Sequence, residues 1–113
     1  MAKGGFPGGM GGMGNMQQLM RQAQKMQQDV AKKQEELNER EFEATAGGGV
    51  VHVVVYGRKE LKSITIAPEV IDPDDAEMLQ DLVVAAVNEA LRKADEAISA
   101  EMGRLTGGMN LGF

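Results

Sequence analysis

The sequence predicts an α+β fold in which a three-stranded antiparallel meander is flanked by two long helices, in the order α-β-β-β-α. Three observations support this prediction. Residues 16–40 contain no glycine or proline and are dominated by good helix formers. Residues 50–56 are almost entirely β-branched or aromatic, as is typical of a strand. Asp72-Pro73, followed by further acidic residues, is typical of a helix start.

The bulk composition is that of one small domain without disulfides. The chain has 113 residues, no cysteine, no tryptophan and one tyrosine, so we expect an aliphatic core. No apolar run reaches the ~18 residues of a membrane span, and the N-terminus lacks the apolar core of a secretory signal, which predicts a cytoplasmic protein. We expect a disordered Gly/Met-rich tail over residues 1–14, a single domain over residues 15–106 and a flexible C-terminal tail over residues 107–113.

The first helix is expected to begin after Asn15, which is a favourable N-cap residue, and to end near Arg40. Its apolar side chains form a narrow seam with the seven-residue period of a coiled coil, which Lys33 interrupts at one position. A stripe this narrow does not hold a lone helix in water, so it must pack against another element. The seam consists of Met16, Leu19, Ala23, Met26, Val30 and Leu37.

Three strands are expected between the helices. Residues 41–46 alternate between polar and apolar side chains, which indicates a half-buried strand. Gly47-Gly48-Gly49 makes a turn, residues 50–56 form the central strand, and residues 61–66 form the third strand. The short connections predict an antiparallel meander. Because residues 50–56 are apolar at odd and even positions alike, we expect the sheet to need cover on both faces.

The second helix is expected to run from about Pro73 to Leu105, with Asp72 as its N-cap. The acidic residues of its first turn are interpreted as caps and favourable helix-dipole charges, because the spacing of a calcium-binding loop is absent. Its broad apolar face is rich in small residues, which would allow a close approach to the sheet. That face consists of Leu79, Leu82, Val83, Ala86, Val87, Ala90, Ala94 and Ala97.

No pattern of catalytic, metal-binding or cofactor-binding residues is found, which predicts that the chain is not an enzyme and uses no cofactor. His52 is the only histidine, and no cysteine is present to act with it, so it is interpreted as a structural or surface residue. The glycines at 47–49 lie between two expected strands, whereas a phosphate-binding loop leads from a strand into a helix.

The net charge of −5 argues against nucleic acid, but the charges lie in blocks. Residues 1–34 carry five basic residues and one acidic residue, and residues 68–91 carry seven acidic residues and no basic one. On a helical wheel, Arg21, Lys25 and Lys32 fall within ~40° of one another, opposite the apolar seam. Such a block gives a local positive field on an acidic protein, although three charges also suit an ordinary solvated face.

The expected apolar surfaces exceed what one chain covers. One long helix covers one face of the sheet, which leaves the other face and the seam of the first helix without a partner. A second copy of the chain is the simplest partner, so we predict a two-fold homodimer. Dimerisation would also double a basic stripe that is thin on one chain.

The chain resembles the YbaB/EbfC family of nucleoid-associated proteins over nearly its whole length. The resemblance lies in NMQQLMRQAQKMQQDV, EFEATAGGGVVHVVVYG, the ending GGMNLGF and, most specifically, ITIAPEVIDPDDAEMLQDLVVAAVNEALRKADE. It implies a cytoplasmic, nucleoid-associated homodimer that binds double-stranded DNA, with no enzyme activity, cofactor, membrane or small-molecule substrate. In the family the protruding helices carry the DNA contacts, which implies here Arg21, Lys25, Lys32, Lys33, Arg92, Lys93 and Arg104.

Because no base-reading motif is present, contacts to phosphates are expected to predominate. A second interpretation stays open. Two helices flanking β-hairpins also describe prefoldin subunits, so an acidic protein-interaction or chaperone-like module that does not bind DNA directly is the alternative. The interrupted seam at Lys33 argues against this alternative.

Overall fold

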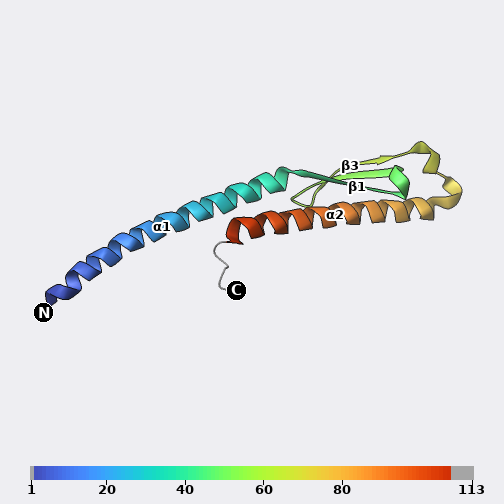
Figure 1. Cartoon of the computed structure of the whole chain (residues 1–113). Helices are drawn as coiled ribbons and strands as arrows, with labels where there is room; N and C mark the ends of the chain where they lie inside the picture. Colours follow the sequence, from blue (N-terminus) through green and yellow to red (C-terminus); the bar gives the residue numbers. More distant parts are fainter. Residues whose placement is uncertain (1, 108–113) are drawn as a thin grey trace. The chain divides into compact units, whose positions relative to one another are not determined.

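The computed structural model describes the backbone of residues 2–107 and the side chains of residues 15–107. It confirms the predicted α+β fold, with two long helices and one three-stranded antiparallel sheet (Figure 1). The chain divides into two compact units, residues 1–32 and residues 33–113. The elements are α1 (Ala2–Glu39), β1 (Glu41–Ala46), a 3-10 turn (Gly47–Gly49), β2 (Val51–Tyr56), β3 (Leu61–Ile66), 3-10 turns at Pro68–Val70 and Pro73–Asp75, and α2 (Ala76–Thr106).

The first unit consists of the N-terminal part of α1. This helix begins at Ala2, whereas the sequence predicted a start after Asn15. The later start was predicted because residues 2–14 contain Pro7 and many glycines, all poor helix formers. The division into a tail of residues 1–14, a domain of residues 15–106 and a C-terminal tail stays a prediction, and residues 108–113 lie outside the described residues.

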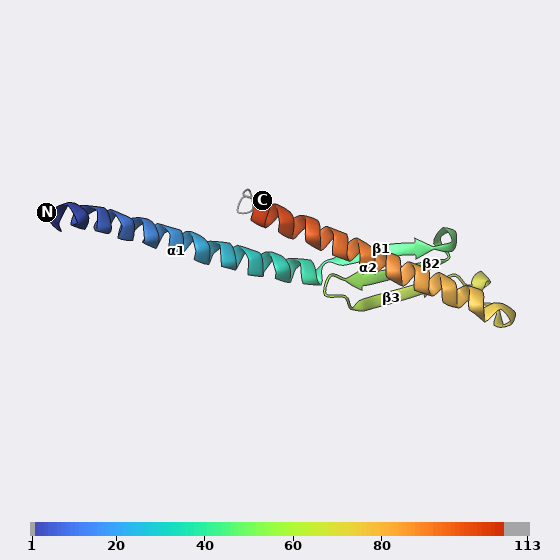
Figure 2. The ribbon, with the colours of Figure 1, turned by 90° about the horizontal axis from the view of Figure 1, so that it is seen from below.

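The core of the second unit lies between one face of the sheet and α2. β1 and β2 pair so that Phe42 lies opposite Val55 and Ala44 lies opposite Val53. All four side chains are buried, and α2 packs over β1 and β2 on this face (Figure 2). The alternation predicted for residues 41–46 is therefore confirmed, with every second side chain turned toward α2.

α2 approaches the sheet closely because its central contact positions are alanines. Ala86, Ala90 and Ala94 recur every four residues, which places them on one face of the helix, and each has 0% of its surface exposed. They pack in one cluster with the buried valines of β2. The broad face of small residues predicted for this helix is confirmed, and it explains how a single helix seals one side of the sheet.

The opposite face of the sheet is polar, so the prediction that both faces need apolar cover is wrong. In the register, His52 of β2 lies between Thr45 of β1 and Thr65 of β3. Val54 lies between Glu43 and Ser63 in the same way. The central strand is apolar on both sides, but its neighbours on this face are acidic or hydroxyl-bearing. Cover of this face by a second chain is therefore not required by burial.

Glycine is required at two places in the second unit. The turn between β1 and β2 has positive φ at Gly47, Gly48 and Gly49, with values of 64°, 75° and 101°, a region that L-residues with a side chain rarely adopt. The predicted turn is confirmed. At Gly57, a Cβ atom would lie 1.8 Å from the backbone oxygen of Leu37, so only glycine allows the chain after β2 to pass the end of α1.

The second helix starts one turn later than predicted. The carboxylate of Asp72 accepts a hydrogen bond of 2.9 Å from the backbone N–H of Asp74, which caps the 3-10 turn. Asp75 caps α2 itself by accepting a hydrogen bond of 3.3 Å from the backbone N–H of Met78. The acidic residues act as caps, as the sequence predicted, but they cap two successive elements instead of one.

Candidate nucleic-acid interface

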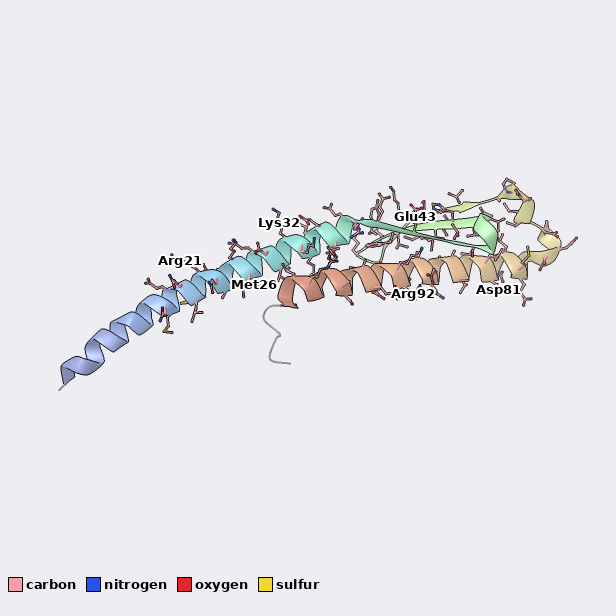
Figure 3. The ribbon with its side chains drawn as sticks, viewed as in Figure 1. Arg21, Met26, Lys32, Glu43, Asp81 and Arg92 are labelled. Carbon is pink, nitrogen blue, oxygen red and sulfur yellow. The ribbon has the colours of Figure 1, made fainter. Side chains whose placement is uncertain are left out.

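The first unit carries a basic stripe, which we define as Arg21, Lys25 and Lys32 on α1. All three residues are exposed. Arg21 and Lys32 lie on one side of the helix and Met26 lies on the other, as Figure 3 shows. Among the side chains that the structure describes, none of the three stripe residues forms an ion pair. These cations are therefore available to an external anion.

The apolar seam on the other side of α1 is poorly covered within the first unit. The seam residues Met16 and Leu19 are 60% and 61% exposed, and the neighbouring Met20 is 62% exposed, whereas Met26 and Val30 are half-buried. The stripe and the seam together make this part of α1 amphipathic, with cations opposite thioether and aliphatic side chains.

Lys33 differs from the stripe because it forms an ion pair. Its Nζ lies 3.0 Å from Oε1 of Glu101 on α2. The second carboxylate oxygen of Glu101 pairs with Arg104. The hydrogen bond from Lys33, with the nearby charge of Arg104, lowers the pKa of Glu101 below its usual value. A lysine fits this position of the apolar seam because its partner on α2 is the carboxylate of Glu101.

Arg92 and Lys93 are also engaged within the protein. Arg92 pairs with Glu89 and Glu96 on its own helix, and its hydrogen bond to Glu89 lowers the pKa of that carboxyl group. Figure 3 shows Arg92 on the side of α2 that faces away from the sheet. Lys93 extends along the edge of α2 and donates a hydrogen bond of 3.2 Å to the backbone oxygen of Glu43 in β1.

The seven residues implied by the family resemblance thus fall into two groups. The basic stripe has no partner within the described part of the chain, whereas Lys33, Arg92, Lys93 and Arg104 all contact protein oxygens. Arg40, which is not among the predicted site residues, lies 5.1 Å from the ring centre of Phe42 and has no ion pair among the described side chains. Because the neighbouring residues are mostly acidic, the charge pattern of the sequence did not mark Arg40 as part of a basic region.

The cations of the sheet region are paired as well. Arg58 lies 2.8 Å from Glu60, Lys62 lies 2.7 Å from Glu41, and Lys59 pairs with Asp95 of α2. The guanidinium of Arg58 also lies 4.0 Å from the ring centre of Tyr56. These cations provide a natural comparison with the basic stripe, because they carry the same charge but already have carboxylate partners.

The described residues include no group of three or more histidine, cysteine or acidic side chains arranged to hold a metal ion. His52 lies 3.0 Å from Glu43 on the polar face of the sheet. Within the described part of the chain, no helix has the length and apolar character needed to cross a membrane.

Comparison with known proteins gives a consistent result. The profile of the YbaB/EbfC DNA-binding family matches residues 13–109. A nucleoid-associated protein of Acetivibrio thermocellus is 64% identical over 109 residues, which cover 96% of this chain and 94% of the relative. A nucleoid-associated protein of Alkaliphilus metalliredigens is 61% identical over 111 residues, which cover 98% of this chain and 96% of the relative.

A crystal structure of an uncharacterized Helicobacter pylori protein has the same fold. The two structures superpose with a TM-score of 0.66 at 21% sequence identity, over 77% of this chain and 91% of that one.

Proposed function

This chain belongs to the YbaB/EbfC DNA-binding family, and we propose on that basis that it binds double-stranded DNA and associates with the nucleoid. The relatives named as nucleoid-associated proteins support this assignment over nearly the full chain. The proposal includes no catalytic activity and no cofactor. A mobility shift with a random-sequence duplex at two salt concentrations tests it directly. We expect binding at low salt that weakens at high salt, and absence of binding at low salt would contradict it.

One observation supports the location of the DNA contact. The basic stripe consists of exposed cations on one side of α1, with no carboxylate partner among the described side chains. Binding a phosphate there breaks no ion pair. Binding at Arg92 or Arg104 would first have to break one. We therefore place the primary contact on the stripe and give the α2 cations a lesser part.

The chemistry of the stripe favours the phosphate backbone over the bases. Lysine and arginine along a helix side neutralise phosphates, which position a protein on DNA without reporting its sequence. If each chain contacts about three phosphates, a dimer contacts about six, and affinity then depends steeply on salt. The seven acidic residues between positions 68 and 91 lie in the second unit, outside the stripe.

We also propose that the chain is a homodimer, and a patch beside β3 supports this. Leu61 and Ile64 lie opposite Val55 and Val53, on the side of the sheet that α2 covers. α2 packs over β1 and β2 but leaves Leu61 46% and Ile64 37% exposed. The strand itself has a free edge, because the sheet order is β1-β2-β3.

We infer that α2 extends the patch. Lys93 reaches β1 from one side of the helix, and Asp95 pairs with Lys59, in the turn before β3, from the other side. On a helical wheel, Val84 falls on the Asp95 side, and it is 57% exposed. A two-fold axis brings the same patch of two chains together, so an apolar patch at a free strand edge can pair with its own copy, and we take a second copy as the partner.

The dimer proposal predicts that Leu61→Asp/Ile64→Asp abolishes dimerisation. Two buried charges on the β3 patch should raise the dimer dissociation constant by at least about 100-fold, because charges without partners are costly in an apolar contact. Sedimentation equilibrium gives the mass, which should fall from twice 12.1 kDa to a single chain of 12.1 kDa.

The matched control for this experiment is Ser63→Asp/Thr65→Asp, which adds the same charges to the polar face of the same strand. We expect it to remain dimeric. A wild-type protein that sediments as a monomer at micromolar concentration would refute the dimer. Equal effects of the two variants on dimerisation would refute the proposal that the patch forms the dimer contact.

A protein-binding function is the second candidate, and one observation favours it. The seam residues Met16 and Leu19 and the neighbouring Met20 are each about 60% exposed. Flexible methionine surfaces suit varied protein partners. A protein that fails to shift DNA at low salt but protects an unfolded client from aggregation would establish this chaperone-like alternative.

A further inference from the structure

Glu101 joins two cations from different helices. One carboxylate oxygen lies 3.0 Å from Nζ of Lys33, near the end of α1, and the other pairs with Arg104, one turn further along α2. The Glu101 side chain is only 18% exposed, whereas Arg104 is 74% exposed. The positive charge of Arg40 also acts on this carboxylate. Two cations therefore pair with a single acid, and a third adds to the positive field on it.

The same place is open to an anion from outside. A hollow of about 250 Å³ is lined by Lys33, Glu101, Arg104 and Leu105. Two cations beside an open hollow have the arrangement that holds a phosphate group, except that a carboxylate already lies between them. A DNA phosphate would have to replace Glu101 as the partner of Lys33 and Arg104.

We propose that Glu101 is a built-in competitor of DNA phosphate that holds Lys33 and Arg104 in ion pairs and so limits how tightly the protein binds DNA. The inference rests on the proposed DNA-binding function and adds a regulating residue to it. Its physical basis is that a cation already paired with a carboxylate does not neutralise a DNA phosphate and so releases no counterion from the DNA, and counterion release supplies most of the sequence-independent affinity.

The direct test is Glu101→Gln in the full chain, measured by fluorescence anisotropy with a random-sequence duplex at several salt concentrations. Each freed cation should steepen the dependence of log affinity on log salt by about 0.9, and affinity at about 0.1 M salt should rise at least tenfold. The matched control is Glu77→Gln, which removes the same charge from an exposed position in the first turn of α2. We expect that control to change affinity less than about twofold.

A second variant tests the inference without removing Glu101. Because Lys33 and Arg104 are already neutralised, Lys33→Gln/Arg104→Gln should lower wild-type affinity less than about threefold, and the same pair of changes should cancel the gain in the Glu101→Gln background. The inference is overturned if Glu101→Gln and Glu77→Gln behave alike, or if Lys33→Gln/Arg104→Gln weakens the wild-type protein tenfold or more. Failure of the wild-type protein to bind DNA would instead reject the proposed function itself.

Discussion

Neutralising the basic stripe should abolish most DNA binding. In Arg21→Gln/Lys25→Gln/Lys32→Gln, the proposed dimer would lose about six phosphate contacts, and the affinity for a random-sequence duplex at about 0.1 M salt should fall at least 100-fold. The substitutions affect exposed side chains with no ion pair among the described residues, and glutamine keeps the helix propensity of the site. The fold should therefore be unaffected, which circular dichroism would verify.

The control for this prediction removes the same charge elsewhere. Arg58→Gln/Lys59→Gln/Lys62→Gln deletes three cations that already pair with Glu60, Asp95 and Glu41. If the stripe is the contact, this control should lose less than about threefold in affinity. Equal losses in the two triple variants would mean that binding follows net charge, and an unchanged stripe variant would remove α1 from the interface.

Gly57→Ala should destabilise the protein by about 3 kcal/mol, the largest stability change that we expect from a single methyl group here. The added Cβ would lie 1.8 Å from the backbone oxygen of Leu37, which is itself 3% exposed and held in the core. The backbone N–H of Gly57 also donates a hydrogen bond of 2.8 Å to the backbone oxygen of Arg40, so the chain at Gly57 cannot move away from α1 without losing this bond. Urea denaturation would measure the change in the free energy of unfolding.

Gly103→Ala is the matched control in α2. A Cβ at Gly103 meets no atom within 4 Å, and this position lies inside a helix, where alanine is preferred to glycine by about 0.5–1 kcal/mol. The same chemical change should therefore stabilise the protein at Gly103 and destabilise it at Gly57. Changes of opposite sign in the free energy of unfolding would support the close approach of Gly57 to Leu37. An unchanged free energy of unfolding for Gly57→Ala would contradict it.

The parts of the fold that the sequence predicted correctly are those that depend on local patterns of residues. The alternation of residues 41–46, the β-branched run of β2 and the glycine turn each depend on neighbours a few positions away. The small-residue face of α2 was predicted for the same reason, and Ala86, Ala90 and Ala94 lie where it required.

What sequence could not predict depends on pairing between distant segments. The polar face of the sheet arises because register places Thr45 and Thr65 beside His52, and register is not visible in β2 alone. Likewise, Lys33 looked like a member of a basic helix until α2 brought Glu101 to 3.0 Å from it. Charge counting along the chain cannot separate a cation with a carboxylate partner from one without.

The structure separates the predicted site residues into two groups that the sequence did not distinguish. The wheel grouped Arg21, Lys25 and Lys32, and the structure leaves those three exposed. The resemblance added four further cations by region, and the structure gives each of those four a protein oxygen as partner. The difference between the groups is the basis for proposing that the stripe makes the phosphate contacts.

The central claim is that the stripe cations contact phosphates, and the salt dependence of binding tests it most directly. For the wild-type protein on a random-sequence duplex, log affinity plotted against log salt should have a slope of about −5, from about six phosphates contacted by the proposed dimer. The slope of Arg21→Gln/Lys25→Gln/Lys32→Gln should approach zero. Equal slopes for the two proteins would contradict the claim, whatever their affinities at a single salt concentration.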